Sequence, residues 1–254
     1  MTHVSYSEIK NWSVCPFYHK LTYIDKLKLF KGNEHTAFGN AMHDTCENMV
    51  LNEKLKSSQY FVEKYKEVLK KLSDDKYDFD KKLVLEMKEQ GLNLLPQIKP
   101  ALNKYFNNYK TFSTEERLFE DTSYKKYKFK GYVDLVLKTE DGKYHVIDWK
   151  TCSWGWNQWK KNDKMVTYQL TYYKHFFAKK HNVDPKDIET YFILLKRTAK
   201  KDNVEILRVP CGKKKTENAL NFLKKALYNI SSKNYIKNRL SCNFCEFKKT
   251  KHCP

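Results

Sequence analysis

Residues 129–151 read FKGYVDLVLKTEDGKYHVIDWKT. They form two short apolar runs with charged residues at their centres: Asp134 in the first run, and Asp148 and Lys150 in the second. A charge buried in a strand is costly unless it is paired or bound to a metal ion. The pattern therefore predicts two strands whose acids hold a divalent cation beside a scissile phosphate, which indicates a nuclease.

The connection between the two runs decides whether these acids can meet. The residues Glu140-Asp141-Gly142 predict a hairpin. A three-residue loop with its glycine in the left-handed conformation sets Asp134 opposite Asp148, with their Cβ atoms roughly 5 Å apart. A two-residue turn would instead set Asp134 opposite Trp149 and turn it to the other face. The metal hypothesis therefore requires the longer loop, and it places Lys150 on the same face as Asp148.

An isolated Asp-x-Lys can equally belong to a surface hairpin whose acids pair with nearby lysines, but further motifs accompany this one. They are Gly39-x-x-x-His43, Gly131-x-x-Asp134, Asp148-Trp149-Lys150-Thr151 and Gln169-x-x-x-Tyr173, in that order. This set resembles the PD-(D/E)XK nuclease superfamily, and within it the RecB-like branch. The resemblance runs from Ser5 to Cys253 and leaves residues 50–115 unmatched. It implies an α/β fold with a restriction-endonuclease-like core, in which helices flank a mixed central sheet.

The resemblance also implies a site for Mg²⁺ or Mn²⁺. Its ligands would be His43, Asp134, Asp148 and the backbone carbonyl of Trp149. Asp134, Asp148 and Lys150 would form the catalytic set, with Lys150 positioning the attacking water and offsetting charge in the transition state. An isolated helical histidine is usually structural. The assignment of His43 as a metal ligand therefore depends on its spacing from Gly39.

The resemblance implies that Gln169 and Tyr173, which lie one turn apart on one helix face, orient the nucleic-acid backbone. Without the resemblance, the aromatic stripe of this helix would be interpreted as core. Trp154, Trp156 and Trp159 follow the second strand. Exposed indoles beside lysines can stack on unpaired bases. Trp156 is therefore a further candidate for nucleic-acid binding, against the alternative that it packs into the core.

Three acids near these motifs receive no role. Glu47 lies one helical turn beyond His43 and is interpreted as a solvated acid rather than a partner of the site. Glu115 and Glu116 precede a predicted strand, and adjacent exposed acids are commonplace.

Seven cysteines form the second constellation. The odd number and the lack of an apolar export segment argue against a secreted disulfide framework. No uncharged run approaches membrane-spanning length. We therefore expect a cytoplasmic protein of a bacterial or phage-infected host cell, where clustered thiols more often bind metal.

Cys242, Cys245 and Cys253 lie close together, and Cys15 ends a short predicted helix. This arrangement resembles the iron–sulfur staple of AddB-type helicase-nucleases and CRISPR adaptation nucleases, which implies a [4Fe-4S] cluster joining the two ends of the chain. Four thiolates also suit structural zinc, and free thiols are a third possibility. The remaining cysteines are interpreted as spare thiols: Cys46, Cys152 and Cys211.

The composition is consistent with a nucleic-acid partner. Lys and Arg number 49 and Asp and Glu 30, which gives a formal net charge of +19 and a pI of about 9.4. Such an excess favours polyanions, although the lysines are spread through the chain. The 254 residues fit one domain, with a helical insertion over about residues 50–115 that would cap the active-site groove, and a cysteine cluster at 241–254 joined to Cys15.

Periodicity and capping signals predict the elements. Helices are expected at 5–13, 38–53, 58–72, 80–109 (interrupted by Pro96 and Pro100), 163–181 and 216–230, and strands at 116–121, 125–138, 143–150, 188–197 and 203–209.

These observations lead to one principal hypothesis, a metal-dependent DNA nuclease, most simply an exonuclease on single strands or duplex ends. Relatives work in recombination, repair, CRISPR spacer acquisition or viral DNA processing. The chain lacks a P-loop, so it is not itself a helicase but could partner one in a larger complex. The alternatives are a non-catalytic nucleic-acid-binding module and a structural iron–sulfur or zinc protein with incidental acids.

Overall fold

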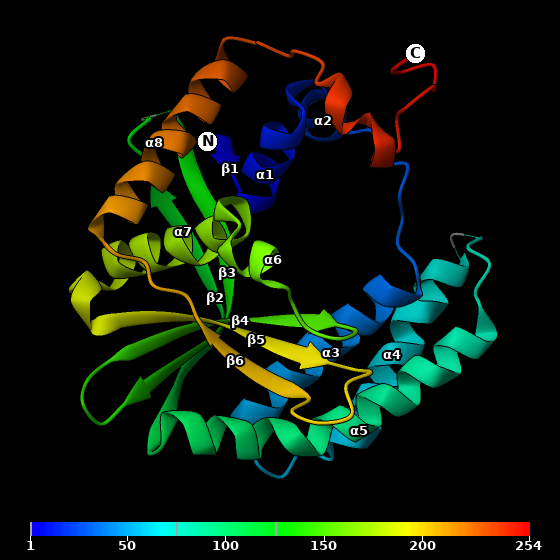
Figure 1. Ribbon diagram of the computed structural model, residues 1–254, viewed down its shortest axis with the longest axis vertical. Helices are drawn as coiled ribbons and strands as arrows, with labels where there is room; N and C mark the ends of the chain where they lie inside the picture. Colours follow the sequence, from blue (N-terminus) through cyan, green and yellow to red (C-terminus); the bar gives the residue numbers. More distant parts are fainter. Residues whose placement is uncertain (1, 75, 125) are drawn as a thin grey trace.

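The computed structural model describes residues 2–74, 76–124 and 126–254, apart from the side chain of Phe244. The chain is built mainly of helices around one sheet (Figure 1). The strands are β1 (Thr2–Val4), β2 (Tyr109–Asp121), β3 (Tyr127–Thr139), β4 (Tyr144–Cys152), β5 (Ile188–Lys196) and β6 (Val204–Arg208). The α-helices are α1 (Tyr6–Val14), α2 (Pro16–His19), α3 (Glu34–Leu51), α4 (Ser57–Asp74), α5 (Lys81–Phe106), α6 (Gln158–Asn162), α7 (Lys164–His181) and α8 (Lys213–Ser231). A π-helix η1 (Lys20–Ile24) and the 3₁₀ helices η2 (Pro185–Asp187) and η3 (Arg239–Phe244) complete the elements.

The mixed sheet has the order β1-β3-β4-β5-β6, with β2 paired to β3. β2 pairs along almost the whole of β3, so the other edge of β3 is shared by β4 and β1. β4 occupies it through Leu135–Lys138, and the parallel strand β1 occupies it at Tyr127–Phe129. The two partners leave the middle of β3 without a ladder partner on that edge. The sheet therefore forks just before Leu135.

The hairpin between β3 and β4 has the predicted register. Leu135 pairs with Ile147, and Thr139 and Lys143 close the loop with a hydrogen bond of 3.1 Å. Gly142 takes the left-handed conformation with φ +83°, which a residue with a Cβ adopts only with strain. Its N–H donates to the Thr139 carbonyl at 3.0 Å. The three-residue loop is confirmed, and the pairing that it sets runs as far as Leu135 and Ile147, directly before Asp134 and Asp148.

Helices cover both faces of the sheet, as the mixed α/β prediction requires. In Figure 1, α1, α7 and α8 lie on one face and α3, α4 and α5 on the other. One buried cluster joins Phe129, Val146 and Phe192 to the first set. Another joins Leu137, Ile147 and Ile193 to the second. The central strands are therefore apolar on both faces, which explains their nearly continuous hydrophobic runs.

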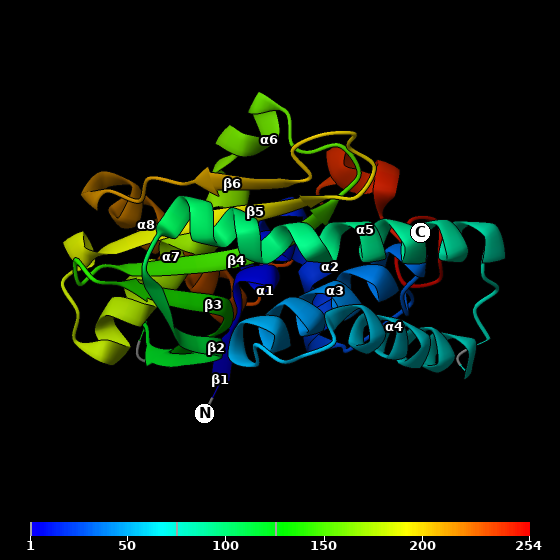
Figure 2. The ribbon, with the colours of Figure 1, turned by 90° about the horizontal axis from the view of Figure 1, so that it is seen from below.

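The segment expected as a helical insertion contains two long helices, α4 and α5. α4 and α5 pack against α3 and share its buried cluster, through residues such as Phe61 and Leu94. In Figures 1 and 2 both helices reach past the ends of the strands. The predicted interruption of α5 is wrong, because the helix continues through Pro96 and Pro100. Its buried face, at Leu95 and Ile98 among others, holds it to the sheet despite the missing N–H groups.

The two end segments of the described chain lie side by side. α1 and α2 approach η3 in Figure 1, and the Phe17 N–H donates to the Ile236 carbonyl at 3.2 Å. The Asn238 side chain donates to the Val14 carbonyl at 2.8 Å. Within the described residues, no helix has both the length and the apolarity to cross a membrane.

Candidate active site

The fork in the sheet places Asp134 between the two layers of helices. Val133 packs toward α7 and Leu135 toward α3, although alternate residues of a regular strand share one face. The regular alternation is therefore broken at Asp134. Its Oδ2 accepts a hydrogen bond of 2.8 Å from the Trp149 N–H across the fork. A side chain thus replaces the backbone ladder at this point, and its carboxylate is fixed while only 8% exposed.

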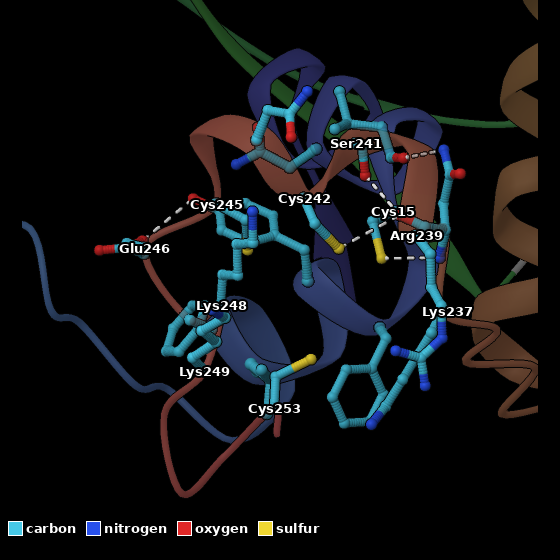
Figure 3. Close-up of a pocket in the computed structure, with 18 of the residues that line it drawn as sticks. Cys15, Lys237, Arg239, Ser241, Cys242, Cys245, Glu246, Lys248, Lys249 and Cys253 are labelled. Atoms are coloured by element: carbon cyan, nitrogen blue, oxygen red, sulfur yellow. Dashed lines mark hydrogen bonds between the residues drawn. The ribbon is translucent and has the colours of Figure 1, made fainter.

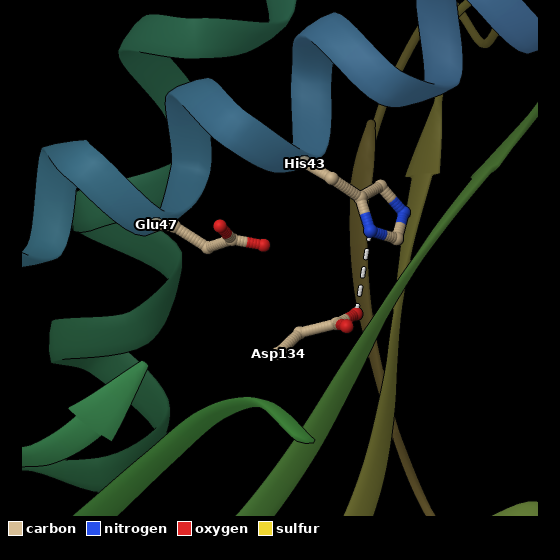
Figure 4. Close-up of side chains that lie close together, drawn as sticks. All are labelled: His43, Glu47 and Asp134. Carbon is tan, nitrogen blue, oxygen red and sulfur yellow. Dashed lines mark ion pairs between the residues drawn. The ribbon is translucent and has the colours of Figure 1, made fainter. Parts of the chain in front are cut away.

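α3 brings two further possible ligands to this carboxylate. His43 and Glu47 lie one turn apart on one helix face, and Figure 4 shows both directed toward Asp134. His43 Nδ1 lies 3.4 Å from Asp134 Oδ2. One ligand atom from each of the three residues falls within 4.8 Å of the other two. Glu47 is buried, so its interpretation as a solvated acid is wrong.

Asp148 belongs to a neighbouring set of contacts. Its Oδ2 lies 2.5 Å from Lys150 Nζ, and its Oδ1 accepts a hydrogen bond of 2.6 Å from Gln169 Nε2. Gln169 Nε2 also donates to the Tyr173 hydroxyl at 3.2 Å. Asp148 is 2% exposed and is not part of the three-residue group around Asp134. The residues of the sequence motifs are thus brought together, but as two adjoining clusters.

The acids of the site crowd one another in a poorly solvated place. Burial raises the pKa of Asp134 well above its usual value, and the charge of Asp148 adds to this effect. Burial, followed by the charge of Glu115, raises the pKa of Glu47 to about 8. Burial lowers the pKa of His43, which therefore remains a neutral imidazole. These carboxyl groups therefore resist ionisation without a cation, and a divalent metal ion that takes the place of their protons, beside a neutral imidazole, would relieve the crowding.

A groove gives access to this donor set. It has a volume of about 630 Å³, and its wall includes Gly39, His43, Glu47, Glu115 and Thr151. Glu115 lies against Glu47, although the sequence suggested an ordinary exposed acid. The donors are carboxylate oxygens and one imidazole nitrogen. Such oxygen-rich sets suit Mg²⁺ and Mn²⁺, so the residues present fit the cation implied by the sequence.

A glycine leaves room for the aromatic partner of Gln169. A Cβ added at Gly131 would lie 3.0 Å from Tyr173 Cε1 and 3.0 Å from Phe129 Cε1. Both rings are buried, so they have little space to retreat. The motif Gly131-x-x-Asp134 therefore joins two requirements: room for Tyr173 and a carboxylate at the fork.

The three indoles after β4 differ in exposure, and Trp156, the candidate for nucleic-acid binding, is the least exposed of them. Trp156 is half-buried against Phe192, with ring centroids 5.0 Å apart, and Lys160 Nζ lies 4.7 Å from its ring centre. Trp154 and Trp159 are 75% and 88% exposed. These two, rather than Trp156, present indole surface to solvent.

The four predicted cluster cysteines surround one pocket of about 880 Å³ between the end segments: Cys15, Cys242, Cys245 and Cys253 (Figure 3). All are free thiols. The Asn238 N–H donates to Cys15 Sγ at 3.3 Å. Among the described residues, the group around Asp134 is the only one in which three possible metal ligands lie within 4.8 Å of one another, so the sulfurs are more widely spaced.

Sequence reasoning assigned no role to Glu47 or Glu115, and among the three tryptophans it selected Trp156 rather than Trp154 and Trp159. For Glu47 a signal existed, since an acid four residues after a ligand histidine shares its helix face. For Glu115 the only signal was its place as one of two adjacent acids near the start of a strand, because its side chain reaches the groove from a residue with φ +48°.

Comparison with known proteins agrees with this geometry. The model of the PD-(D/E)XK nuclease superfamily matches residues 3–252. A solved structure from Eubacterium rectale, named "Putative exonuclease", is 12% identical, with a TM-score of 0.63 over 99% of this chain and 90% of that one. Another, SSO0001, is 15% identical over 91% of each chain, and its TM-score of 0.38 is too low to indicate a shared fold. No curated protein matches significantly. The sequence motifs, the forked sheet and the family match lead to one assignment: the chain belongs to the PD-(D/E)XK nuclease superfamily.

Proposed function

We propose that this protein is a metal-dependent DNA nuclease that removes nucleotides from single strands or exposed duplex ends. The observation that carries the proposal is the pair of adjoining clusters at the fork. One cluster holds the carboxylates of Asp134 and Glu47 with a neutral imidazole, and the other holds Asp148 against Lys150. A purely structural role would not require so much negative charge in a buried place beside an open groove.

The residues divide the work between holding a cation and orienting the reactants. Asp134, Glu47 and His43 would hold Mg²⁺ or Mn²⁺, with Asp148 and the Trp149 carbonyl beside them. The cation, when bound, supplies charge neutralisation at the phosphate and acidifies water. Lys150 places a fixed positive charge next to Asp148, where it can orient the attacking water and stabilise the negative charge that develops on the phosphate. Gln169 holds the Asp148 carboxylate in its orientation, and Tyr173 in turn contacts Gln169.

DNA ends and single strands are proposed as the substrate on three grounds. The net charge of +19 favours a polyanion. The Eubacterium rectale protein of the same fold is named as an exonuclease. Exposed indoles beside the site, at Trp154 and Trp159, suit unpaired bases better than a closed duplex.

Cleavage of labelled oligonucleotides tests the proposal. Single-stranded and duplex DNA, labelled at the 5′ or the 3′ end, are incubated with Mg²⁺ or Mn²⁺ and compared with RNA of the same sequence. We expect stepwise shortening by the wild type and a loss of at least about 100-fold in Lys150→Ala. Lys143→Ala is the control, because this exposed lysine pairs with Asp141 at the hairpin loop. Binding without cleavage by the wild type would contradict the proposal and support a non-catalytic module.

We further propose that the four thiols around the end-segment pocket bind a [4Fe-4S] cluster. The pocket wall also carries Lys237, Arg239, Lys248 and Lys249, whose charges would offset those of thiolates. Among the described residues no three of these sulfurs lie within 4.8 Å of one another. A single tetrahedral zinc ion, with Zn–S bonds of about 2.3 Å, would require them to move closer together.

Anaerobic purification tests the cluster. We expect a broad absorbance band near 400 nm and about four iron atoms per chain, both lost in Cys242→Ser. Cys46→Ser is the control, since this thiol is buried among α3 and its neighbours. One zinc per chain and no band would replace the cluster with a structural zinc ion.

A further inference from the structure

A second groove is lined in part by α6 and is separate from the acidic groove of the active site. It has a volume of about 750 Å³ and is formed by α6, the start of α7, β6 and the start of α8. Its wall carries five basic side chains and no acidic one: Lys161, Lys164, Arg208, Lys214 and Lys215. The whole chain has 30 acids for 49 basic residues, so a wall without acids is more basic than the protein as a whole.

The charges of this groove are only partly neutralised by the protein. Lys161 pairs with Glu205 at 2.5 Å, and Arg208 pairs with Glu189 at 2.9 Å. Lys164 and Lys214 have no ion pair within the described part of the chain. The groove therefore keeps uncompensated positive charge that an anion can use.

Two exposed indoles lie in or just before the same short helix, α6. Trp159 belongs to α6, next to residues of the groove wall, and Trp154 lies in the loop that leads from β4 to α6. In Figure 2, α6 stands out from the body of the molecule on the side of β6. Indoles that are 75% and 88% exposed cover no core, and their faces can stack on unpaired bases.

Basic residues also connect α6 to the active site. The charges of Lys150 and Lys160 both act on Lys10 of α1, which places these three ammonium groups near one another. Lys150 belongs to the catalytic cluster, and Lys160 belongs to α6. Positive charge therefore lies between the active site and α6, although the carboxylate of Asp163 acts on Lys10 as well.

From this arrangement we propose that α6 and the basic groove bind single-stranded nucleic acid next to the active site. Lys164 and Lys214 contact phosphates in the groove, and Trp154 and Trp159 stack on bases at its rim. A single strand is favoured over a duplex because stacking needs base faces that pairing covers. The proposal rests on the proposed function for its substrate class, but it concerns binding alone.

Binding measured under conditions that prevent cleavage tests the groove proposal separately from the nuclease proposal. Fluorescence anisotropy with labelled oligo-dT and with blunt duplex of equal length is recorded in EDTA, at several salt concentrations. For Lys164→Glu/Lys214→Glu we expect a loss of affinity for oligo-dT of about tenfold and a less steep salt dependence, with a slope smaller by about 1.4 for two lost phosphate contacts. Lys224→Glu/Lys225→Glu on α8 is the control, because it changes the net charge equally outside the groove wall.

The indoles are tested in the same way. Trp154→Ala/Trp159→Ala removes two stacking surfaces and should weaken oligo-dT binding by about 30-fold or more and duplex binding much less. Tyr228→Ala, an aromatic that is 59% exposed on α8, should have no effect. Equal losses in groove and control variants, unchanged affinity in both test variants, or equal losses for duplex and single strand would overturn the proposal. If the wild type binds as expected but cleaves nothing, the groove stands and the nuclease proposal fails.

Discussion

Replacing Lys150 with methionine removes the ammonium group that faces Asp148 at 2.5 Å. The two partners differ in their access to water, because the Asp148 side chain is 2% exposed and that of Lys150 is 29% exposed. A buried carboxylate cannot reach solvent when its partner is lost. A lysine, in contrast, can extend its flexible chain toward water. Lys150→Met should therefore destabilise the protein more than Asp148→Asn.

The size of the effect follows from the burial of the pair. Breaking a fully buried pair by removing one partner costs about 3–5 kcal/mol. Because Lys150 is nearly a third exposed and Gln169 still binds Asp148, we expect about 2–3 kcal/mol for Lys150→Met. Asp148→Asn should cost about 1 kcal/mol. In a chain of this size 1 kcal/mol shifts Tm by about 2–4 °C, so Lys150→Met should lower Tm by about 4–12 °C.

A double-mutant cycle measures the interaction directly. Thermal and urea unfolding are recorded in EDTA for both single variants and for Asp148→Asn/Lys150→Met, which should regain about 1–2 kcal/mol relative to the sum of the singles. Lys143→Met, which removes an exposed pair, should change stability by less than about 0.5 kcal/mol. A coupling near zero, or a larger cost for Asp148→Asn, would refute the reasoning.

Three further predictions concern other parts of the site and its scaffold. Glu47→Gln should weaken Mn²⁺ binding by at least about tenfold in calorimetry without lowering the Tm of the metal-free protein. Glu63→Gln, on the exposed face of α4, should change neither the Mn²⁺ affinity nor the Tm. Gly131→Ala should cost about 1–3 kcal/mol in urea unfolding, because its Cβ meets a buried ring at 3.0 Å, while Gly212→Ala, with no atom within 4 Å, should cost at most about 0.5 kcal/mol. Burial would raise the pKa of Glu116, but hydrogen bonds from two basic side chains of α7 outweigh it and hold this pKa below its usual value. Its stabilising effect is then present above its unfolded pKa of about 4.3 and lost as the pH falls through the folded value. The stability gap to Glu116→Gln, about 1 kcal/mol at pH 7, should therefore close below about pH 4, and a gap that widens in acid would contradict this sign.

Local sequence signals predicted the hairpin at the centre of the fold. Gly142 limits the loop to a few conformations, and the alternation of apolar residues fixes the register, so the pairing of β3 with β4 as far as Leu135 and Ile147 could be derived from neighbouring residues. The fork beyond this pair, which separates Asp134 from Asp148, could not. Most helices and strands followed from periodicity in the same way. β1 was missed because a strand of three residues has no period to detect.

Contacts between distant segments could not be predicted from local signals. The spacing of Glu47 from His43 places both on one face of α3, but whether that face meets solvent or Asp134 depends on how α3 lies across the fork. The same limit applied to the indoles: three tryptophans close in sequence gave no indication that Trp156 would pack on Phe192 while Trp154 and Trp159 stay outside. The resemblance to a family supplied the order of the motifs, but not these contacts.

The pairing of the two end segments has a consequence for biosynthesis. The contact between Phe17 and Ile236 joins residues that leave the ribosome far apart in time, and β1 must likewise wait for Tyr127–Phe129. α1 therefore lacks its partners α7 and α8 while the first part of the chain emerges, and Ile9 and Tyr6 stay uncovered during that time. Nascent chains should be most susceptible to proteases and chaperone binding during this interval. On a ribosome stalled before residue 236, the α1–α2 segment should lack its contacts with Ile236 and Asn238.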